Sequence, residues 1–450
     1  MSAKMDEHLK KDGACVVSQS NQQQIPEGYK QTVAGLIPID WVLIPFGEMI
    51  SELRGGANLS PSDYTGNGIP VIPKSGVTWG GILKIKEKDL QFCSLKLRSK
   101  FSSNMVDQSY SAIVLRDLVP SGPNIGLVVS INESKEYLLA QGVYGFKLKS
   151  DFSAKYLAQL SNSLEYRKLM KSILVGSTQV HIRSSTLKET ELVVPPTKKE
   201  QTAIANALSD VDGLIGSLEK LIAKKRAIKT AAMQQLLTGK KRLPPFDKTH
   251  TGYKKTELGE IPNDWEVVSL LDVTNLIHGK AHEPYVVDAG DYIVVNSKFV
   301  STEGKVRKTC SKNDCPAKKG DVLMVLSDLP NGKALAKCYL VNKDSIYAVN
   351  QRVCIYRSTK IVPEFLFYNL NRLKYFLGLD DGVTQTHILN GDIAACQIYV
   401  PKDHEEQKAI ACVLSDMNQD IEALEQRLNK TKQIKQGMMQ ELLTGRTRLV

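Results

Sequence analysis

Residues 197–239 read TKKEQTAIANALSDVDGLIGSLEKLIAKKRAIKTAAMQQLLTG, and residues 403–445 read DHEEQKAIACVLSDMNQDIEALEQRLNKTKQIKQGMMQELLTG. Both belong to a longer repeat, in which residues 176–243 align without a gap to residues 382–449 and 29 of the 68 positions are identical. Ordinary residue usage would give roughly four identities, at ~5–7% per position. Since this period is too long for a solenoid repeat, the chain contains a duplicated domain.

Each stretch predicts one long amphipathic helix with its own start and stop signals. Thr197 and Glu200 form a capping-box pattern, in which the hydroxyl accepts the Glu200 amide and the carboxylate reaches back; Asp403 and Glu406 hold the same places in the second copy. Both stretches end in Leu-Leu-Thr-Gly, and the glycine suits a left-handed C-cap. About 41 residues at ~1.5 Å each give a rod of roughly 60 Å.

A seam of apolar residues follows each helix start, at the alternating spacings of four and three that are typical of coiled coils. The seam residues are Ile204, Leu208, Val211, Ile215, Leu218 and Ile222 in the first copy, and Ile410, Leu414, Met417, Ile421, Leu424 and Leu428 in the second. A stripe this narrow and long needs a partner helix, so we predict that the two copies pair antiparallel within the chain. The alternative is that each helix packs only on its own domain.

The segments before the two helices share only their beginnings. Residues 29–41 and 253–265 have eight identities in 13 positions, in the pattern Tyr-Lys-x-Thr-x-x-Gly-x-Ile-Pro-x-Asp-Trp. Beyond this pattern the copies diverge, and both read as mixed α/β. We expect strands near residues 69–73, 113–115, 126–131, 293–296, 322–326 and 352–356, and helices over 154–170 and 363–376.

The predicted fold class is α+β, with two pseudo-symmetric mixed α/β domains joined by two long antiparallel helices in an intramolecular coiled coil. The predicted boundaries are an N-terminal extension (1–28), a first domain (29–196), a central helix (197–243), a linker (244–252), a second domain (253–401) and a C-terminal helix (402–450).

The net charge of +11 and the pI near 9.0 favour a polyanionic partner, although many soluble proteins are mildly basic. The basic runs 224–226 and 240–242 either lie along DNA phosphates or form a solvated face and a basic linker, and the second interpretation is favoured. No apolar run approaches the ~18 residues that span a bilayer, and residues 1–24 lack a signal-peptide core. We therefore expect a cytoplasmic protein without membrane contact.

The cysteines and histidines predict no metal site. Eight cysteines in 450 residues are too sparse for a disulfide scaffold. Cys310 and Cys315 have no second Cys/His pair at ligand spacing, which leaves zinc a weak alternative. His278 and His282 are four apart, but the intervening Gly279 argues against a helix that would place them on one face.

Catalytic motifs are lacking from the sequence. It contains no Gly-x-x-x-x-Gly-Lys phosphate loop and no Gly-x-Ser-x-Gly elbow. The Leu-Pro-Pro-Phe of residues 243–246 looks like the Asn/Asp-Pro-Pro-Tyr/Phe motif of amino-methyltransferases, but leucine replaces the polar residue that accepts from the target amino group. We interpret it as a stiff linker and predict that the chain has no catalytic residue and binds no cofactor.

A polar Gly-x-Thr-Gln-x-His-Ile segment closes both domains. Gln179 and His181, like Gln385 and His387, are competent to bond a base edge or a phosphate. The alternative is a structural turn in which they satisfy backbone groups, and we favour it because a shared segment cannot explain different sequence choice. Base contacts should then come from unshared polar loops, whose candidates are Arg54, Lys74, Ser75, Lys280, His282, Asn296, Lys298, Lys305, Arg307 and Lys308.

Over nearly its whole length the chain resembles the specificity (S) subunit of Type I restriction–modification systems. The resemblance rests on the duplicated plan and on four motifs. These are the Ile-Pro-x-Asp-Trp openings at Ile37 and Ile261, the Lys-Gly-Asp-Val-Leu of 319–323, the Glu-Gln helix starts at 200–201 and 406–407, and the Gln-x-Leu-Leu-Thr-Gly ends. The chain departs from the family at Asp403 and His404, where a proline-rich start is common.

The resemblance implies two target-recognition domains, each reading one half of a bipartite, gapped site in double-stranded DNA. It implies two adenine methyltransferase (M) subunits as partners, and restriction (R) subunits that join them. S-adenosylmethionine would be bound by the methyltransferase partner and not by this chain. Half-sites on one face of the duplex lie about one turn apart, ~34 Å, which a rigid helical frame can span. A stand-alone methyltransferase or endonuclease and a coiled-coil scaffold that binds no DNA remain as alternatives.

Overall fold

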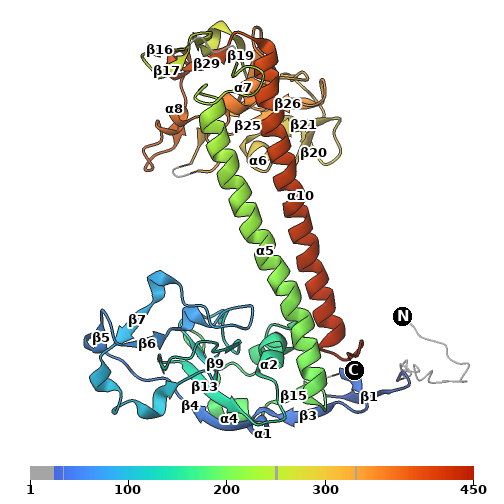
Figure 1. Ribbon diagram of the computed structural model, residues 1–450. Coiled ribbons are helices and arrows are strands. Elements are labelled where there is room, and N and C mark those ends of the chain that lie inside the picture. Colours follow the sequence, from blue (N-terminus) through green and yellow to red (C-terminus); the bar gives the residue numbers. More distant parts are fainter. Residues whose placement is uncertain (1–24, 34, 249–251, 330–331, 450) are drawn as a thin grey trace, which may run out of the picture. The chain divides into compact units, whose positions relative to one another are not determined.

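The computed structural model describes residues 25–33, 35–248, 252–329 and 332–449 (Figure 1). Most of the expected extension 1–28 and part of the linker 244–252 lie outside these residues. The chain forms two compact units, unit 1 with residues 1–216 and 430–450, and unit 2 with residues 217–429. Two helices of 39 residues each, α5 (Lys198–Leu236) and α10 (His404–Leu442), contribute to both units.

Unit 1 is built on two small sheets. One has the strand order β11-β9-β13-β4 and is antiparallel; the other has the order β5-β7-β6-β12-β8, with β6 and β12 parallel. The strands are β1 (Tyr29–Thr32), β2 (Gly35–Pro38), β3 (Val42–Pro45), β4 (Ile50–Arg54), β5 (Tyr64–Thr65), β6 (Ile69–Ile72), β7 (Gln91–Cys93), β8 (Met105–Val106), β9 (Ser111–Val114), β10 (Arg116–Asp117), β11 (Val128–Ser130), β12 (Tyr137–Leu139), β13 (Val143–Leu148), β14 (Val180–His181) and β15 (Glu191–Val194). The helices are α1 (Phe46–Met49), α2 (Ala154–Leu160), α3 (Leu164–Ser172) and α4 (Ser184–Glu189), with 3₁₀ turns η1 (Pro61–Asp63), η2 (Lys74–Gly76), η3 (Glu87–Asp89), η4 (Leu95–Leu97) and η5 (Ser102–Asn104).

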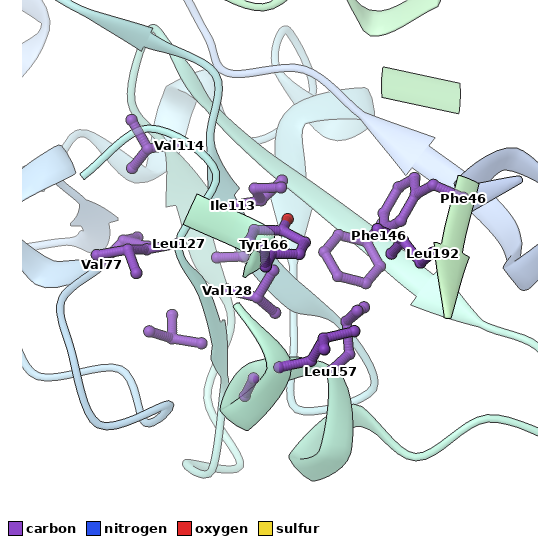
Figure 2. Packing of buried hydrophobic residues seen from close by; sticks show 14 of the residues in the cluster. Phe46, Val77, Ile113, Val114, Leu127, Val128, Phe146, Leu157, Tyr166 and Leu192 are labelled. Atoms are coloured by element: carbon purple, nitrogen blue, oxygen red, sulfur yellow. The ribbon is translucent and has the colours of Figure 1, made fainter. Parts of the chain in front are cut away.

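The core of unit 1 lies where the antiparallel sheet meets α2 and α3. All four residues of β9 (Ser-Ala-Ile-Val) are buried, so its side chains do not alternate between buried and exposed. Figure 2 shows Phe46 beside Phe146, whose rings meet edge to face with centroids 5.1 Å apart. Leu157 of α2 and Tyr166 of α3 belong to the same cluster.

Unit 2 repeats this plan with shorter connections. Its sheets have the orders β19-β27-β23-β25 and β20-β22-β21-β26, and β21 and β26 are parallel. The strands are β16 (Tyr253–Thr256), β17 (Gly259–Pro262), β18 (Trp265–Ser269), β19 (Thr274–His278), β20 (Val286–Val287), β21 (Tyr292–Val295), β22 (Thr309–Cys310), β23 (Val322–Val325), β24 (Ser327–Asp328), β25 (Cys338–Leu340), β26 (Tyr347–Val349), β27 (Val353–Ser358), β28 (Thr386–His387) and β29 (Gln397–Pro401). The helices are α6 (Ser297–Ser301), α7 (Pro363–Leu370), α8 (Lys374–Leu377) and α9 (Asn390–Ala395), with 3₁₀ turns η6 (Leu270–Asp272) and η7 (Glu283–Tyr285).

The two units therefore share one topology. The order β25-β23-β27-β19 matches β11-β9-β13-β4, and the parallel pair β21/β26 matches β6/β12. Each of the six expected strands overlaps an observed strand. The chain is thus an α+β protein with two repeated domains of one fold.

The two expected domain helices are each broken in the structure. Residues 154–170 form α2 and α3, because Ser163 caps a new helix by accepting a hydrogen bond from the Tyr166 amide at 3.2 Å. Residues 363–376 form α7 and the start of α8, because Arg372 adopts a left-handed conformation (φ 62°) that interrupts a helix. Apolar periodicity does not detect such breaks, since it continues across them.

The helix-start prediction is half right. Thr197 Oγ1 accepts a hydrogen bond from the Glu200 amide at 3.3 Å, as a capping box requires. In the second copy Asp403 accepts from the amide of Glu405 at 2.8 Å, one residue earlier than expected. Neither Glu200 nor Glu406 reaches back to its cap, because each carboxylate binds an arginine instead.

In unit 2 that arginine is Arg242, which follows α5. Its Nε and Nη2 donate to the two carboxylate oxygens of Glu406 at 2.8 and 2.6 Å, and its Nη2 lies 2.8 Å from Asp264. The indole of Trp265 donates to the same carboxylate at 3.2 Å. Hydrogen bonding to Glu406 raises the pKa of Arg242. Lys240 and Lys241 are exposed, whereas Arg242 is buried, so the prediction of a solvated basic linker is wrong for Arg242.

In unit 1 the corresponding arginine is Arg448, which follows α10. It binds Glu200 at 2.5 Å (Nε) and 2.8 Å (Nη2), and its Nη1 and Nη2 each donate to Asp40 at 2.8 Å. In each repeat, the arginine that follows the long helix thus binds a carboxylate of the other repeat. We name the two clusters, Arg242/Glu406/Asp264 and Arg448/Glu200/Asp40, the arginine clamps.

Contacts between α5 and α10 occur inside each unit. In unit 1 Lys435 lies 2.7 Å from Asp212, and in unit 2 Lys225 lies 2.8 Å from Asp420. In each unit the start of one helix lies beside the end of the other, so the pairing is antiparallel there (Figure 1). Because Lys225 and its neighbour Arg226 pair with carboxylates of α10, the run 224–226 is not simply a solvated face.

Each helix also packs on its own domain at its start. Ile204 and Leu208 belong to the core of unit 1, and Ile410 and Leu414 belong to a core of unit 2. The remaining seam residues are buried or half-buried. The alternative, in which each helix packs on its own domain, therefore holds for the helix starts.

Candidate nucleic-acid interface

A two-stranded ribbon carries the shared Gln-x-His of each unit. In unit 1 β10 pairs antiparallel with β14, which places Arg116 opposite His181. In unit 2 β24 pairs with β28 in the same register, which places Ser327 opposite His387. The histidine is common to both ribbons, and the residue across from it differs.

Two main-chain hydrogen bonds define a second pair of corresponding residues. The Leu115 amide donates to the Gly142 carbonyl at 2.9 Å in unit 1, and the Leu326 amide donates to the Arg352 carbonyl at 2.9 Å in unit 2. Gly142 and Arg352 therefore occupy equivalent places beside the two ribbons. The hydrogen bond is kept, whereas the backbone conformation and the side chain differ, since Gly142 has a positive φ (+88°) and Arg352 does not.

A groove of about 750 Å³ opens beside the ribbon in unit 1. It is lined by Gly56, Leu115, Arg116, Gln141, Gly142, Tyr144, Gln179, His181, Ile182, Arg183 and Ser184. These residues supply two guanidinium groups, two carboxamides and an imidazole, and no carboxylate is among them. Such a lining is suited to phosphates and to the acceptor-rich edges of bases.

The shared glutamines bond side chains across the ribbon and not the backbone groups that we expected. In unit 1 Arg116 Nη2 donates to Gln179 Oε1 at 2.9 Å. In unit 2 Gln385 Nε2 donates to Ser327 Oγ at 2.9 Å. The amide of each glutamine turns to suit its partner, since a carboxamide offers both an acceptor and a donor.

The expected loop residues of unit 1 fall into two groups. Arg54 is half-buried and held within the domain, with Nε 2.6 Å from Glu52 and Nη1 donating to the Met105 carbonyl at 2.6 Å. Lys74 and Ser75 lie on η2, and Lys74 Cε is close enough to Gly142 that a Cβ there would approach it to 2.8 Å. The structure thus places Lys74 beside Gly142, which lines the groove, and holds Arg54 within the domain by ion pairing and hydrogen bonding.

In unit 2 two of the expected residues have structural roles. The ring of His282 is completely buried, its Nδ1 lies 2.7 Å from the Lys280 carbonyl and its Nε2 accepts from the Asp314 amide at 3.0 Å. Asn296 caps α6 by accepting from the Phe299 amide at 2.9 Å. We correct both, because their polar atoms are already used within the domain.

The remaining expected cations of unit 2 stay accessible. They are Lys280, Lys298, Lys305, Arg307 and Lys308, all exposed. Arg307 Nε donates to the Gly304 carbonyl at 2.6 Å, which orients the loop after α6. Lys298 lies on α6 and the others lie on loops, and Lys305 lines a pocket together with Arg226 and Glu303.

Cys310 and Cys315 are both buried, and burial raises the pKa of each thiol. Within the described residues no three His, Cys, Asp or Glu side chains are grouped as metal ligands would be. None of the helices in that part of the chain is long and apolar enough to cross a membrane.

Sequence reasoning missed Arg116 and Arg352. A signal for the second was present, because Gln141-x-Val143 aligns with Gln351-x-Val353 and the intervening residue differs. For Arg116 there was none, since its two-residue strand carries no periodicity.

The family described as Type I restriction modification DNA specificity domain matches the chain twice, over residues 50–226 and 262–435. These matches cover well over half of the chain and one lies in each repeat. The chain belongs to this family, and is the specificity subunit of a Type I restriction–modification system. Such a subunit is the non-catalytic member of its enzyme.

Two relatives come from Methanocaldococcus jannaschii. The Type I restriction enzyme MjaVIII specificity subunit is 29% identical over 451 residues, covering 94% of this chain and 96% of the relative. The putative Type I restriction enzyme MjaX specificity subunit is 27% identical over 452 residues, covering 94% and 97%.

Two solved structures share the fold. The Type I restriction–modification S subunit from M. genitalium has a TM-score of 0.54 at 15% identity, covering 89% of this chain and 96% of that one. A structure described as the basis of complex assembly and conformational transition of the type I R-M system has a TM-score of 0.53 at 14% identity, covering 91% and 99%.

Proposed function

We propose that the chain recognises a bipartite, gapped site in double-stranded DNA, with one half-site read by each repeated domain (29–196 and 253–401). The observation that carries the proposal is the pair of ribbons. They keep the same register and the same Gln-x-His, and they differ at the residues beside them. Two domains that recognise different half-sites need the same backbone scaffold with different residues at the DNA contacts.

We propose further that α5 and α10 form an antiparallel intramolecular coiled coil that sets the distance between the half-sites. The contacts between the two helices within each unit support it, as does the length of 39 residues, roughly 60 Å at ~1.5 Å per residue. A rigid spacer of this length can hold two domains about one helical turn of DNA apart, ~34 Å.

The partners that we propose are two methyltransferase subunits, with restriction subunits joining that complex. S-adenosylmethionine would then be bound by the methyltransferase subunit. Affinity for DNA would come largely from phosphate contacts, in keeping with the net charge of +11.

The first test is methylation sequencing of DNA from cells that express this chain with its methyltransferase subunit, compared with the methyltransferase subunit alone. A gapped, two-part adenine-methylation motif that requires this chain is the expected result. No motif, although both proteins are soluble and co-purify, would contradict the proposal and favour an assembly scaffold. Methylation by the purified chain with S-adenosylmethionine alone would favour a stand-alone methyltransferase.

Modularity is tested by exchanging residues 42–175 for the same region of another specificity subunit. This region contains Arg116, Gln141 and Gly142 of the groove but not Gln179 or His181. We expect one half-site to change and the other to remain. A change in both half-sites would contradict the assignment of one half-site to each domain.

A further inference from the structure

We propose that Arg116 in unit 1 and Arg352 in unit 2 are specificity-determining residues, each of which reads a guanine in the half-site of its own domain. The inference rests on the proposed function and names the side chains that act within it. Its starting point is that the two ribbons carry their arginine at different places.

In unit 1 the arginine stands on the ribbon itself. Arg116 is exposed and lines the groove, and its Nη2 is held at 2.9 Å by Gln179 Oε1. A guanidinium has five N–H donors, and this contact uses one of them. Gln179 therefore orients Arg116 and leaves N–H donors of the guanidinium free to bond a guanine.

The residue next to Arg116 makes room for it. Gly142 has φ +88°, and a Cβ added there would come within 3.0 Å of Arg116 Cβ and 2.8 Å of Lys74 Cε. Any larger residue at this position would crowd the Cβ and carbonyl of residue 116 and the end of the Lys74 side chain. Gly142 thus keeps the space beside the base of Arg116 and beside Lys74 open.

In unit 2 the large and small residues are exchanged. Ser327 takes the place of Arg116, is buried and accepts from Gln385 Nε2 at 2.9 Å. Arg352 takes the place of Gly142 and is exposed. Each ribbon thus has an exposed arginine at one of these two positions, on β10 in unit 1 and directly before β27 in unit 2, and the unit 1 groove holds Arg183 in addition.

The exchanged position of the arginine is suited to selecting a DNA base. A guanidinium fork bonds O6 and N7 of guanine together, which is the commonest specific contact in the major groove. The glutamine and histidine are common to both domains and cannot alone distinguish two half-sites. An arginine that extends from a different strand would contact a base at a different position of the half-site, although the ribbon itself is the same.

The experiment is methylation sequencing of the full chain with its methyltransferase subunit, comparing Arg116→Ala, Arg116→Lys and Arg352→Ala with the unmutated chain. For Arg116→Ala we expect one guanine of one half-site to become degenerate, with discrimination there reduced roughly five- to 150-fold and the other half-site unchanged. Arg352→Ala should relax the other half-site. Arg116→Lys should relax the same guanine as Arg116→Ala, since a lysine keeps the charge and loses the fork.

The matched control is Arg98→Ala, because Arg98 is an exposed arginine of unit 1 that does not line the groove and pairs with Glu136. It should leave the motif intact. If the Arg116 and Arg352 variants kept the motif and methylated every site more weakly, the two arginines would contact phosphates, and the proposal would be overturned. No effect of these variants on methylation would also overturn it. If Arg116→Ala fails to co-purify with the methyltransferase subunit, Arg116→Lys and Arg352→Ala decide the question. Absence of any gapped motif with the unmutated chain would instead refute the proposed function.

Discussion

The Arg242 guanidinium lies against the Glu406 carboxylate in a two-point contact, with N–O distances of 2.8 and 2.6 Å. Both side chains are almost completely buried, at 4% and 1% exposure. Arg242 lies near the end of the first repeat and Glu406 in the first turn of α10, so this pair connects the two repeats inside unit 2. Two parallel N–H···O bonds to a carboxylate give both energy and a defined orientation.

The first prediction concerns this clamp. Arg242→Ala leaves a buried carboxylate without its counter-charge, and we expect the free energy of unfolding of unit 2 to fall by roughly 3–5 kcal/mol. Glu200 is about as buried as Glu406 (2% and 1% exposed), but the Arg448 side chain is 29% exposed, so water reaches this guanidinium and Arg448→Ala should cost somewhat less than Arg242→Ala. Urea denaturation followed by circular dichroism measures both.

The control for the clamp is the double variant Arg242→Met with Glu406→Gln. It removes both charges, so it should recover most of the stability that Arg242→Ala loses. Equal losses in the single and double variants would show that the packing of the arginine matters and its charge does not.

The second prediction is a pH dependence of the clamp in unit 1. The hydrogen bond from Arg448 holds the pKa of Asp40 below its ordinary value of 3.8. A carboxyl whose folded-state pKa is depressed stabilises the fold above its unfolded pKa, and this contribution is lost as the pH falls through the folded pKa. The stability difference between the unmutated chain and Asp40→Asn should therefore be constant from pH 7 to about pH 5 and shrink below about 3.8. Thermal melts across this range test it, and a difference that does not change down to pH 3 would contradict the role of Asp40.

The third prediction concerns the glycine that ends α5. Gly239 has φ 69°, and a Cβ there would come within 2.5 Å of Pro262 Cδ. Gly239→Ala should destabilise unit 2 by about 1–3 kcal/mol, since alanine meets both a strained conformation and a clash. Gly216→Ala, at a helical position with open space, should instead stabilise the chain by up to ~1 kcal/mol. Opposite shifts in melting temperature are the expected result, and equal shifts would contradict it.

The fourth prediction separates the two parts of the helix seam. Leu208 is fully buried in the core of unit 1, so Leu208→Asp should unfold that domain. Leu218 is buried on α5 but belongs to none of the clusters that form the domain cores, so Leu218→Asp should loosen the helix pairing and leave the domains folded. Limited proteolysis distinguishes the cases, with cleavage confined to the helices near residue 218 in the second variant. Loss of both domains in Leu218→Asp would mean that helix pairing and domain folding are one transition.

The long helices were predictable from the sequence because their information is local. A cap at Thr197, a seam with heptad spacing and a glycine at 239 each act within a few residues, and α5 and α10 follow them closely. The family was recognisable for a related reason, since the duplicated motifs are contiguous in sequence. The same local patterns did not predict the helix breaks at Ser163 and Arg372. A side-chain cap at Ser163 and a left-handed backbone conformation at Arg372 interrupt the helices there.

The sequence by itself determined the duplication, the two long helices and the family, all of which are written in short-range patterns. Only the tertiary structure decided what Glu200 and Glu406 bind, because their arginines lie 248 and 164 residues away along the chain. It also decided that Arg116 and Gly142 meet beside one ribbon, and that His282 is enclosed within its domain. Such contacts depend on which distant segments of the chain pair, and the pattern within one segment does not specify the segment with which it pairs.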